Sequence, residues 1–257
     1  METIAGLINA KAAGVVVWLG IFFIAERLLP QAPPPDEPGH DRLGRNGGLW
    51  LINVVLSPLV VLPLTAWAAG HGLVARPAWW SGWWAVGLDL VVLDGLIYWW
   101  HRANHELPPL WRFHGVHHLD RFLDSTSALR FHFGEVLLSA AVRAAVIVLL
   151  GLPLASILVF ESALLAATIF HHSNLRLPHA FERRLALILV TPSIHWVHHH
   201  RHRADTDSNY STIFSLWDRL FGSRSATIRT PAMPIGIEDE DDLPLAQLLL
   251  RPFRRRR

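Results

Sequence analysis

Residues 98–118, YWWHRANHELPPLWRFHGVHH, contain five histidines, and their spacing restricts the fold of this chain more than any other feature. Residues three or four positions apart lie on one face of a helix, so His101 and His105 are predicted to share a face. The same arrangement is repeated by His114, His117 and His118. A neutral imidazole offers one nitrogen to a metal while its other nitrogen donates a hydrogen bond. Since one zinc site takes roughly three or four protein ligands, we expect two metal ions.

A second cluster, TPSIHWVHHH at residues 191–200, shows the same spacing in His195, His198 and His199. Between the clusters lie four more histidines: His132, His171, His172 and His179, the last of which is expected to be incidental. The chain has no cysteine, which excludes thiolate metal sites and cysteine nucleophiles. Any metal must therefore bind to imidazole, carboxylate or water, and these ligands suit iron as well as zinc.

The composition places the chain in a lipid bilayer. Of its 257 residues 51% are hydrophobic and 17% are charged, whereas soluble domains carry about 25% charged residues. Apolar runs at residues 5–29, 47–69 and 79–100 are long enough to cross about 30 Å of hydrocarbon. The prolines of segment 31–46 predict a loop. Residues 134–170 predict two helices folded back at Gly151.

The predicted fold is therefore all-α: a multi-pass integral membrane bundle of three spanning helices plus a helical hairpin, with a histidine-rich di-metal cap. Nearly all arginines fall in the segments on the side of the histidine clusters, and only Lys11 and Arg76 lie in the outer ones. This bias predicts that the cap faces the cytoplasm of a bacterial inner membrane. The basic end of the tail, RPFRRRR, is expected to contact lipid headgroups.

Several polar residues are candidates for roles beside the metals or in the substrate cavity. Asp94 and Tyr98 share a helix stripe with the first two histidines, although Asp94 could equally make an interhelical hydrogen bond and Tyr98 could anchor the interface. Asp205, Asp207 and Asn209 are candidate acceptors for imidazole N–H groups or solvated loop residues. Arg143 and Glu161 lie on opposite arms of the hairpin and predict a buried ion pair.

The order of the motifs resembles that of the fatty acid hydroxylase/sterol desaturase superfamily of membrane di-iron enzymes. H-x-x-x-H and H-x-x-H-H come first, then a histidine before Ser-Asn, then H-x-x-H-H with DSNYS and WDRLFGS. The resemblance covers residues 85–222 of a single membrane domain, 1–257, and leaves a tail at 223–257. It implies these metal ligands: His101, His105, His114, His117, His118, His172, His195, His198 and His199.

The resemblance leaves three further residues open as ligands. His132 precedes Phe133, where relatives often have proline. His171 is a bystander or an alternative ligand beside His172, which occupies the His-Ser-Asn position. Asn174 is a weak ligand or a hydrogen-bond partner.

The resemblance implies an enzyme that uses two iron ions and O2 to hydroxylate or desaturate a lipid in lipid biosynthesis. An external electron donor (a reductase, ferredoxin or cytochrome) is expected, because the chain has no dinucleotide-binding motif. Nothing suggests a nucleic acid partner. The alternatives are a zinc-dependent membrane hydrolase, which would need an H-E-x-x-H motif, and a non-catalytic metal-binding or transport protein. The lipid and the choice among hydroxylation, desaturation and ether cleavage stay open.

Overall fold

The computed structural model describes residues 2–34 and 39–254, and in these ranges it is helical, with extended segments paired only at isolated bridges. The long helices are α1 (Glu2–Leu28), α2 (Gly39–Leu56) with its continuation α3 (Leu62–Gly70), α4 (Trp83–Glu106), α6 (Phe133–Leu150) and α7 (Leu154–His172). The short helices are α5 (Pro108–His118), α8 (His179–Leu185), α9 (Pro192–His198), α10 (Arg203–Thr206), α11 (Leu216–Leu220) and α12 (Leu245–Leu250). The all-α prediction is confirmed.

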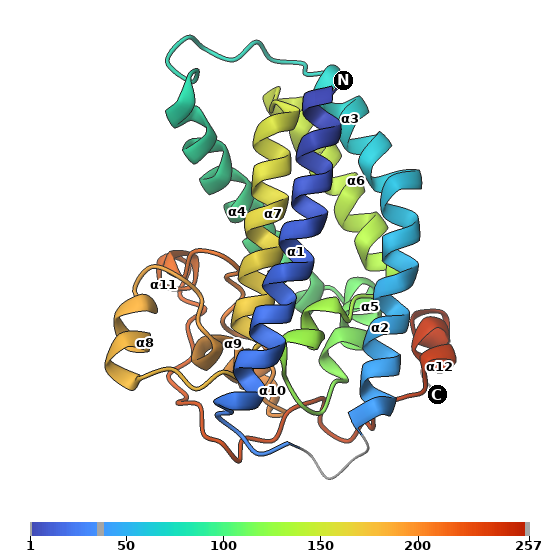
Figure 1. Ribbon diagram of the computed structural model, residues 1–257, viewed down its shortest axis with the longest axis vertical. Coiled ribbons are helices and arrows are strands. Elements are labelled where there is room, and N and C mark those ends of the chain that lie inside the picture. Colours follow the sequence, from blue (N-terminus) through green and yellow to red (C-terminus); the bar gives the residue numbers. More distant parts are fainter. Residues whose placement is uncertain (1, 35–38, 255–257) are drawn as a thin grey trace.

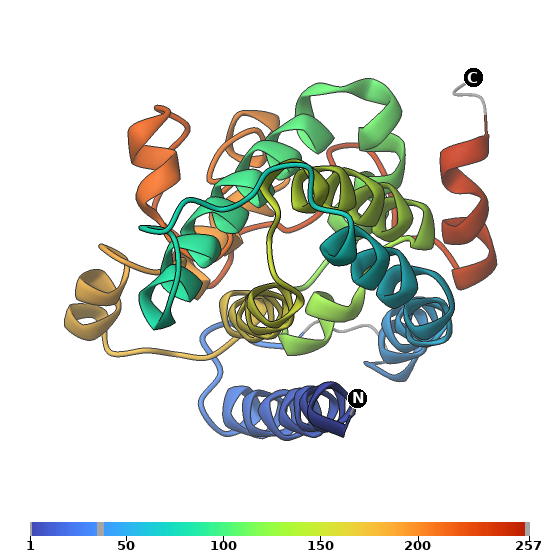
Figure 2. The ribbon, with the colours of Figure 1, turned by 90° about the horizontal axis from the view of Figure 1, so that it is seen from above.

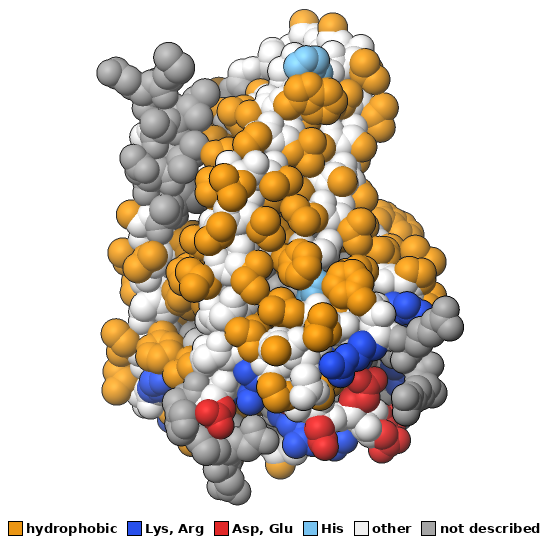
Figure 3. Space-filling model, turned by 90° about the vertical axis from the view of Figure 1, so that its right-hand side faces the viewer, with side chains coloured by type: hydrophobic (Ala, Val, Ile, Leu, Met, Phe, Trp, Pro, Cys, Tyr) orange, Lys and Arg blue, Asp and Glu red, His pale blue; other side chains and the backbone are white. Residues whose placement is uncertain are grey.

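The long helices form a column, and the short helices gather at one end of it (Figures 1 and 2). We call this end the cap; it comprises residues 107–132 and 173–254. Figure 3 shows hydrophobic side chains over most of the column and charged side chains around the cap. Three helices of the described chain are long and apolar enough to cross a membrane: Asp41–Gly70, Phe133–Leu150 and Leu154–His172. The protein is therefore a multi-pass membrane helical bundle.

The first of these helices is longer than the predicted run at residues 47–69. The loop predicted at residues 31–46 was right for residues 31–34 and wrong for residues 39–46, which are helical. α2 begins at Gly39, directly after the last proline of the segment. Its first turns are held in the cap, where Arg42 Nε donates to Asp120 at 2.7 Å. A π-helical turn at Ser57–Val61, with proline at its start, joins α2 to α3. Such a turn keeps the helix continuous past a proline.

The predicted hairpin is present as α6 and α7. Gly151 ends α6 at a φ of 61°, a left-handed conformation that favours glycine. Arg143 Nη2 lies 3.2 Å from Glu161 Oε1 across the two arms, so the predicted ion pair is confirmed. Fully buried Leu93, Ile147 and Phe160 belong to one hydrophobic cluster that joins α4, α6 and α7.

The junction between α4 and α5 brings the first two histidine motifs together. Leu107 is extended, with φ −98° and ψ 113°, because the residue before a proline avoids the helical region. Pro108 then begins α5, where its missing N–H is not needed. The helix is interrupted here, and α5 packs against α4.

The tail folds back onto the cap. Leu248 of α12 packs in a buried cluster with Leu49 and Val116. An acidic residue of the tail, Asp242, forms an ion pair with buried Arg130. Part of the predicted lipid contact, residues 255–257, lies outside the described residues.

Candidate metal centre

Nine buried histidines converge inside the cap in two groups. Within each group, one ligand nitrogen from every ring lies within 4.8 Å of the others. The five-histidine group consists of His101, His105, His114, His118 and His198. The four-histidine group consists of His117, His172, His195 and His199. These nine histidines are the same nine residues that the sequence motifs predict as metal ligands.

Helical spacing decides which group each ring joins. On α5, His114 and His118 are four residues apart and share a group, whereas His117 points into the other group. The second cluster shows the inverse arrangement: His195 and His199 share the four-histidine group, and His198 joins the five-histidine group. Each i, i+3, i+4 motif therefore serves both groups at once.

Backbone carbonyls orient several of these rings through Nδ1. The pairs are His101 with Tyr210 (2.8 Å), His117 with Arg130 (3.1 Å), His172 with Thr168 (2.7 Å) and His198 with Ser208 (2.6 Å). A carbonyl oxygen only accepts, so Nδ1 carries the proton in each of these rings. Their Nε2 atoms are then left with free lone pairs, the form in which imidazole binds a metal.

Several Nε2 atoms lie within 3.2 Å of each other, which is too close for two rings that both carry their proton on Nδ1 and have no ion between them, as in the pairs His117–His172 and His101–His114. In the four-histidine group, Nε2 of His172 lies 3.0 Å from Nε2 of both His117 and His195. In the five-histidine group, His114 Nε2 lies 3.2 Å from the Nε2 atoms of His101 and His118. With metal–nitrogen bonds of about 2.1 Å, ligands at right angles are about 3.0 Å apart. The side chains of both groups thus fit a metal ion.

Burial keeps these imidazoles neutral. It lowers the pKa of His105, His117, His118, His195, His198 and His199 well below the usual histidine value, and neighbouring histidines lower it further. Among the described residues, Nε2 of His105 and of His198 has no hydrogen-bond partner. Unpaired, unprotonated nitrogens in a buried cluster are the donor set that a transition metal such as iron or zinc prefers.

Two carboxylates contact the histidines. Glu135 Oε1 accepts from His114 Nδ1 at 2.8 Å, and Asp207 Oδ1 lies 3.4 Å from His105 Nδ1. Asp207 was a sequence candidate, whereas Glu135 was missed. The sequence signal for Glu135 was an acidic residue in the first turn of a largely apolar helix. A carboxylate partner fixes the ring of a metal-bound histidine and raises its basicity.

The other three candidates for the site or its cavity make hydrogen bonds to loop residues instead of site imidazoles. Asp94 accepts from the backbone N–H groups of Ile213 (3.1 Å) and Phe214 (3.0 Å). Tyr98 Oη lies 2.9 Å from Ser223 Oγ. Asn174 exchanges two hydrogen bonds of 2.9 Å with the backbone of Ala32. These contacts hold cap loops against α4, α7 and α1.

The remaining sequence candidates lie outside both groups. His132 caps α6: its Nδ1 accepts from Gly134 N–H at 2.9 Å and its Nε2 donates to Leu249 O at 3.1 Å, so both ring nitrogens are in use. His171 Nδ1 donates to Thr212 O at 3.2 Å. The other two are Asp205, which accepts from His200 at 2.7 Å, and Asn209, which donates to Ile194 O at 3.3 Å.

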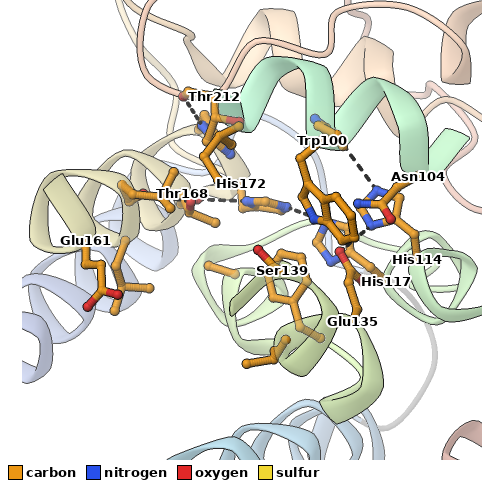
Figure 4. A pocket seen from close by; sticks show the side chains of 18 of the residues that line it. Trp100, Asn104, His114, His117, Glu135, Ser139, Glu161, Thr168, His172 and Thr212 are labelled. Atoms are coloured by element: carbon orange, nitrogen blue, oxygen red, sulfur yellow. Dashed lines mark hydrogen bonds and ion pairs between the residues drawn. The ribbon is translucent and has the colours of Figure 1, made fainter. Parts of the chain in front are cut away.

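A cavity of about 250 Å³ runs from the histidines into the column between α4, α6 and α7. In Figure 4, His114, His117 and Asn104 lie at one end and Glu161 at the other. Its apolar wall includes Ile97, Phe131, Val136, Leu164 and Leu165. Glu135 and Arg143 both line it and are eight residues apart on α6, or about 12 Å along the helix. An elongated apolar molecule could therefore reach the histidines from within the bundle.

The sequence profile of fatty acid hydroxylases matches residues 86–223, more than half of the chain. Ornithine lipid hydroxylase OlsE from Rhizobium tropici is 30% identical over 202 residues, which cover 75% of this chain and 60% of that protein. An alkylglycerol monooxygenase from Danio rerio is 33% identical over 144 residues, or 56% of this chain and 31% of that protein. A cholesterol 25-hydroxylase-like protein, also from Danio rerio, is 30% identical over 144 residues, which cover 54% of this chain and 55% of that protein.

The chain thus spans 60% of the length of the first of these relatives and 31% of the second. No solved structure matches it significantly. The profile match contains all nine histidines of the two groups. The chain belongs to the fatty acid hydroxylase family.

Proposed function

We propose that this protein is an iron-dependent membrane monooxygenase that hydroxylates a lipid with O2. The proposal rests on one observation: an apolar cavity ends at two groups of buried histidines whose ring nitrogens are placed to bind a metal ion. Two of the relatives are named as an ornithine lipid hydroxylase and an alkylglycerol monooxygenase. Both names denote enzymes that add oxygen to a lipid, and they therefore favour hydroxylation over desaturation for this chain.

In this proposal each histidine group holds one iron ion through imidazole nitrogens. The two irons, when bound, supply the redox chemistry that inserts one oxygen atom of O2 into a C–H bond of the lipid and reduces the other to water. That balance needs two electrons and two protons from outside the chain, hence a separate donor such as a reductase, ferredoxin or cytochrome. The whole catalytic region, residues 85–222, works as part of one membrane domain.

The protein's own groups orient the ligands and present the lipid. Glu135 holds the ring of His114, and the carbonyls of Tyr210 and Ser208 hold those of His101 and His198. The cavity wall contributed by α6 and α7 excludes water and directs a lipid chain toward the histidines. In this proposal the cap lies on the cytoplasmic side of a bacterial inner membrane, where a soluble donor can reach it.

The test combines metal content with isotope labelling. Protein purified in mild detergent after growth with iron is expected to hold about two irons per chain. The double variant His117→Ala/His198→Ala should lose them, and His71→Ala, an exposed histidine at the end of α3, should not. Cells that express the wild type under ¹⁸O2 should contain a lipid with one ¹⁸O atom that the double variant lacks. One zinc per chain, or labelled lipid from the double variant, would refute the proposal.

A further inference from the structure

Asn104 is a buried polar side chain without a partner at the metal end of the cavity. It lies on α4 between His101 and His105, is 1% exposed and lines the cavity. Within the described part of the chain, neither Oδ1 nor Nδ2 of its carboxamide has a hydrogen-bond partner. Figure 4 shows it beside His114 and Trp100, at the opposite end of the cavity from Glu161.

The other buried asparagines are used by the protein itself. Asn46 Nδ2 donates to Thr126 Oγ1 at 3.2 Å, Asn174 pairs with the backbone of Ala32, and Asn209 donates to Ile194 O. A buried amide group that lacks its hydrogen bonds destabilises the folded protein, and nearly all buried polar groups in proteins are paired. A carboxamide kept at such a position is best explained by a ligand that pairs with it.

A second unpartnered atom lies at the same end of the cavity. Glu135 Oε2 is buried and, in the described structure, accepts no hydrogen bond, while its Oε1 is occupied by His114. Farther into the column the wall includes apolar Leu164 and Leu165, and it ends at the ion pair of Arg143 with Glu161. The charges of Arg143 and Glu161 at the far end pair with each other, whereas both polar atoms of the Asn104 carboxamide are unpaired. A lipid that fills the cavity would therefore place its polar group near the metals.

We propose that Asn104 is a positioning residue that hydrogen-bonds a hydroxyl or amide group of the lipid next to the carbon that is oxidised. A carboxamide has both a donor and an acceptor, and hydroxyl and amide groups complement both. The substrate class is thus a lipid oxidised at or beside a polar functional group, with its hydrocarbon chain directed toward Arg143 and Glu161. The identification of the oxidised carbon rests on the proposed function, whereas ligand binding at Asn104 does not.

The first experiment measures binding with two probes of equal chain length. The protein in lipid nanodiscs is mixed with 1-decanol or with 1-chlorodecane, which cannot donate a hydrogen bond, and the shift in unfolding temperature is recorded. Decanol should stabilise the wild type more than chlorodecane, and Asn104→Leu should abolish the difference. Asn104→Ser, which retains a donor and an acceptor, should restore part of it. Equal shifts in wild type and Asn104→Leu would overturn the proposal, whether or not any lipid is oxidised.

The unliganded protein supplies the control for folding. If Asn104 had a structural role, Asn104→Leu would unfold at a lower temperature than the wild type. We expect an equal or higher unfolding temperature, because the substitution removes an unpaired buried amide. We also expect unchanged iron content and an unchanged Mössbauer spectrum. A lower unfolding temperature or a loss of iron would assign Asn104 to the fold or to the metals instead.

The second experiment locates the oxygen. In cells labelled with ¹⁸O2, tandem mass spectrometry should place the new oxygen within a few bonds of a hydroxyl or amide group. Asn104→Leu should raise the KM for the extracted lipid about tenfold, the loss of roughly one hydrogen bond, with a smaller change in kcat. Oxygen in the middle of a hydrocarbon chain would overturn the inference while leaving the proposed function intact. If no lipid is labelled, the proposed function fails, and the binding experiment alone decides the role of Asn104.

Discussion

The Nε2 atoms of His117 and His172 lie 3.0 Å apart although the two residues are 55 positions apart in the chain. Each ring donates its Nδ1 proton to a backbone carbonyl, of Arg130 and Thr168 respectively, so the facing Nε2 atoms both present lone pairs. Two lone pairs at this distance repel each other unless a cation lies between them. The arrangement therefore leads to direct predictions about metal content.

The two histidine groups are expected to hold metal independently. His195→Ala, in the four-histidine group, and His105→Ala, in the five-histidine group, should each reduce iron from about two to about one per chain, because each removes a ligand from one group only. Elemental analysis of the purified variants measures this, with His132→Ala as a buried control whose nitrogens are used by the fold. Loss of all metal from either single variant would contradict two separable sites.

Removing the metal should destabilise the cap. A ligand that binds only the folded state stabilises it by about 4 kcal/mol at a thousand times its dissociation constant. Treatment with a chelator is therefore expected to lower the unfolding temperature by several degrees, and added ferrous iron should restore it. Differential scanning fluorimetry in detergent records both steps. An unfolding temperature that does not respond to the chelator would show that no ion supports these histidines.

Glu135 is expected to set the metal affinity of the five-histidine group. Its Oε1 lies 2.8 Å from His114 Nδ1, and loss of such a partner typically costs 10–100-fold in metal affinity or activity. Glu135→Ala should therefore weaken iron binding by about that factor, and Glu135→Gln, which keeps an acceptor oxygen, by less. Competition with a coloured chelator gives the affinities.

The control for this experiment is Glu106→Gln, a surface change in an ion pair with Arg102 near the same cap. It should leave the affinity unchanged. If Glu135→Ala bound iron as tightly as this control, the contact with His114 would have no role in metal binding.

Loss of one partner of the Arg143–Glu161 ion pair should destabilise the protein, whereas loss of both partners should not. Removing one partner of a buried pair leaves an uncompensated charge, whereas replacing both by apolar residues is often neutral or stabilising. Arg143→Leu should lose about 3–5 kcal/mol, and Arg143→Leu/Glu161→Leu should regain most of it. Unfolding in detergent measures both variants. A double variant as unstable as the single one would mean that the pair contributes net stability to the hairpin.

Local patterns in the sequence predicted the helices and the pairings that helices control. The prolines at 108 and 109, Gly151 and the apolar runs located the ends of α4, α6 and α7, since these features act on the residues next to them. The ion pair across the hairpin followed from the cost of leaving either charge alone. The loop predicted at residues 31–46 failed for residues 39–46 because α2 is anchored by Arg42 to Asp120, a contact with a residue far along the chain.

The sequence by itself determined which imidazoles could converge, because i, i+3 and i+4 spacing places them on adjoining faces of short helices. Only the tertiary structure decided which rings of distant segments meet: His117 of α5 joins His172 of α7. It also decided that Asp94 and Asn174 bind loops and that Glu135 contacts His114. The reason is physical. Helical periodicity fixes the direction of a side chain relative to its own axis, whereas its partner depends on how separate segments pack.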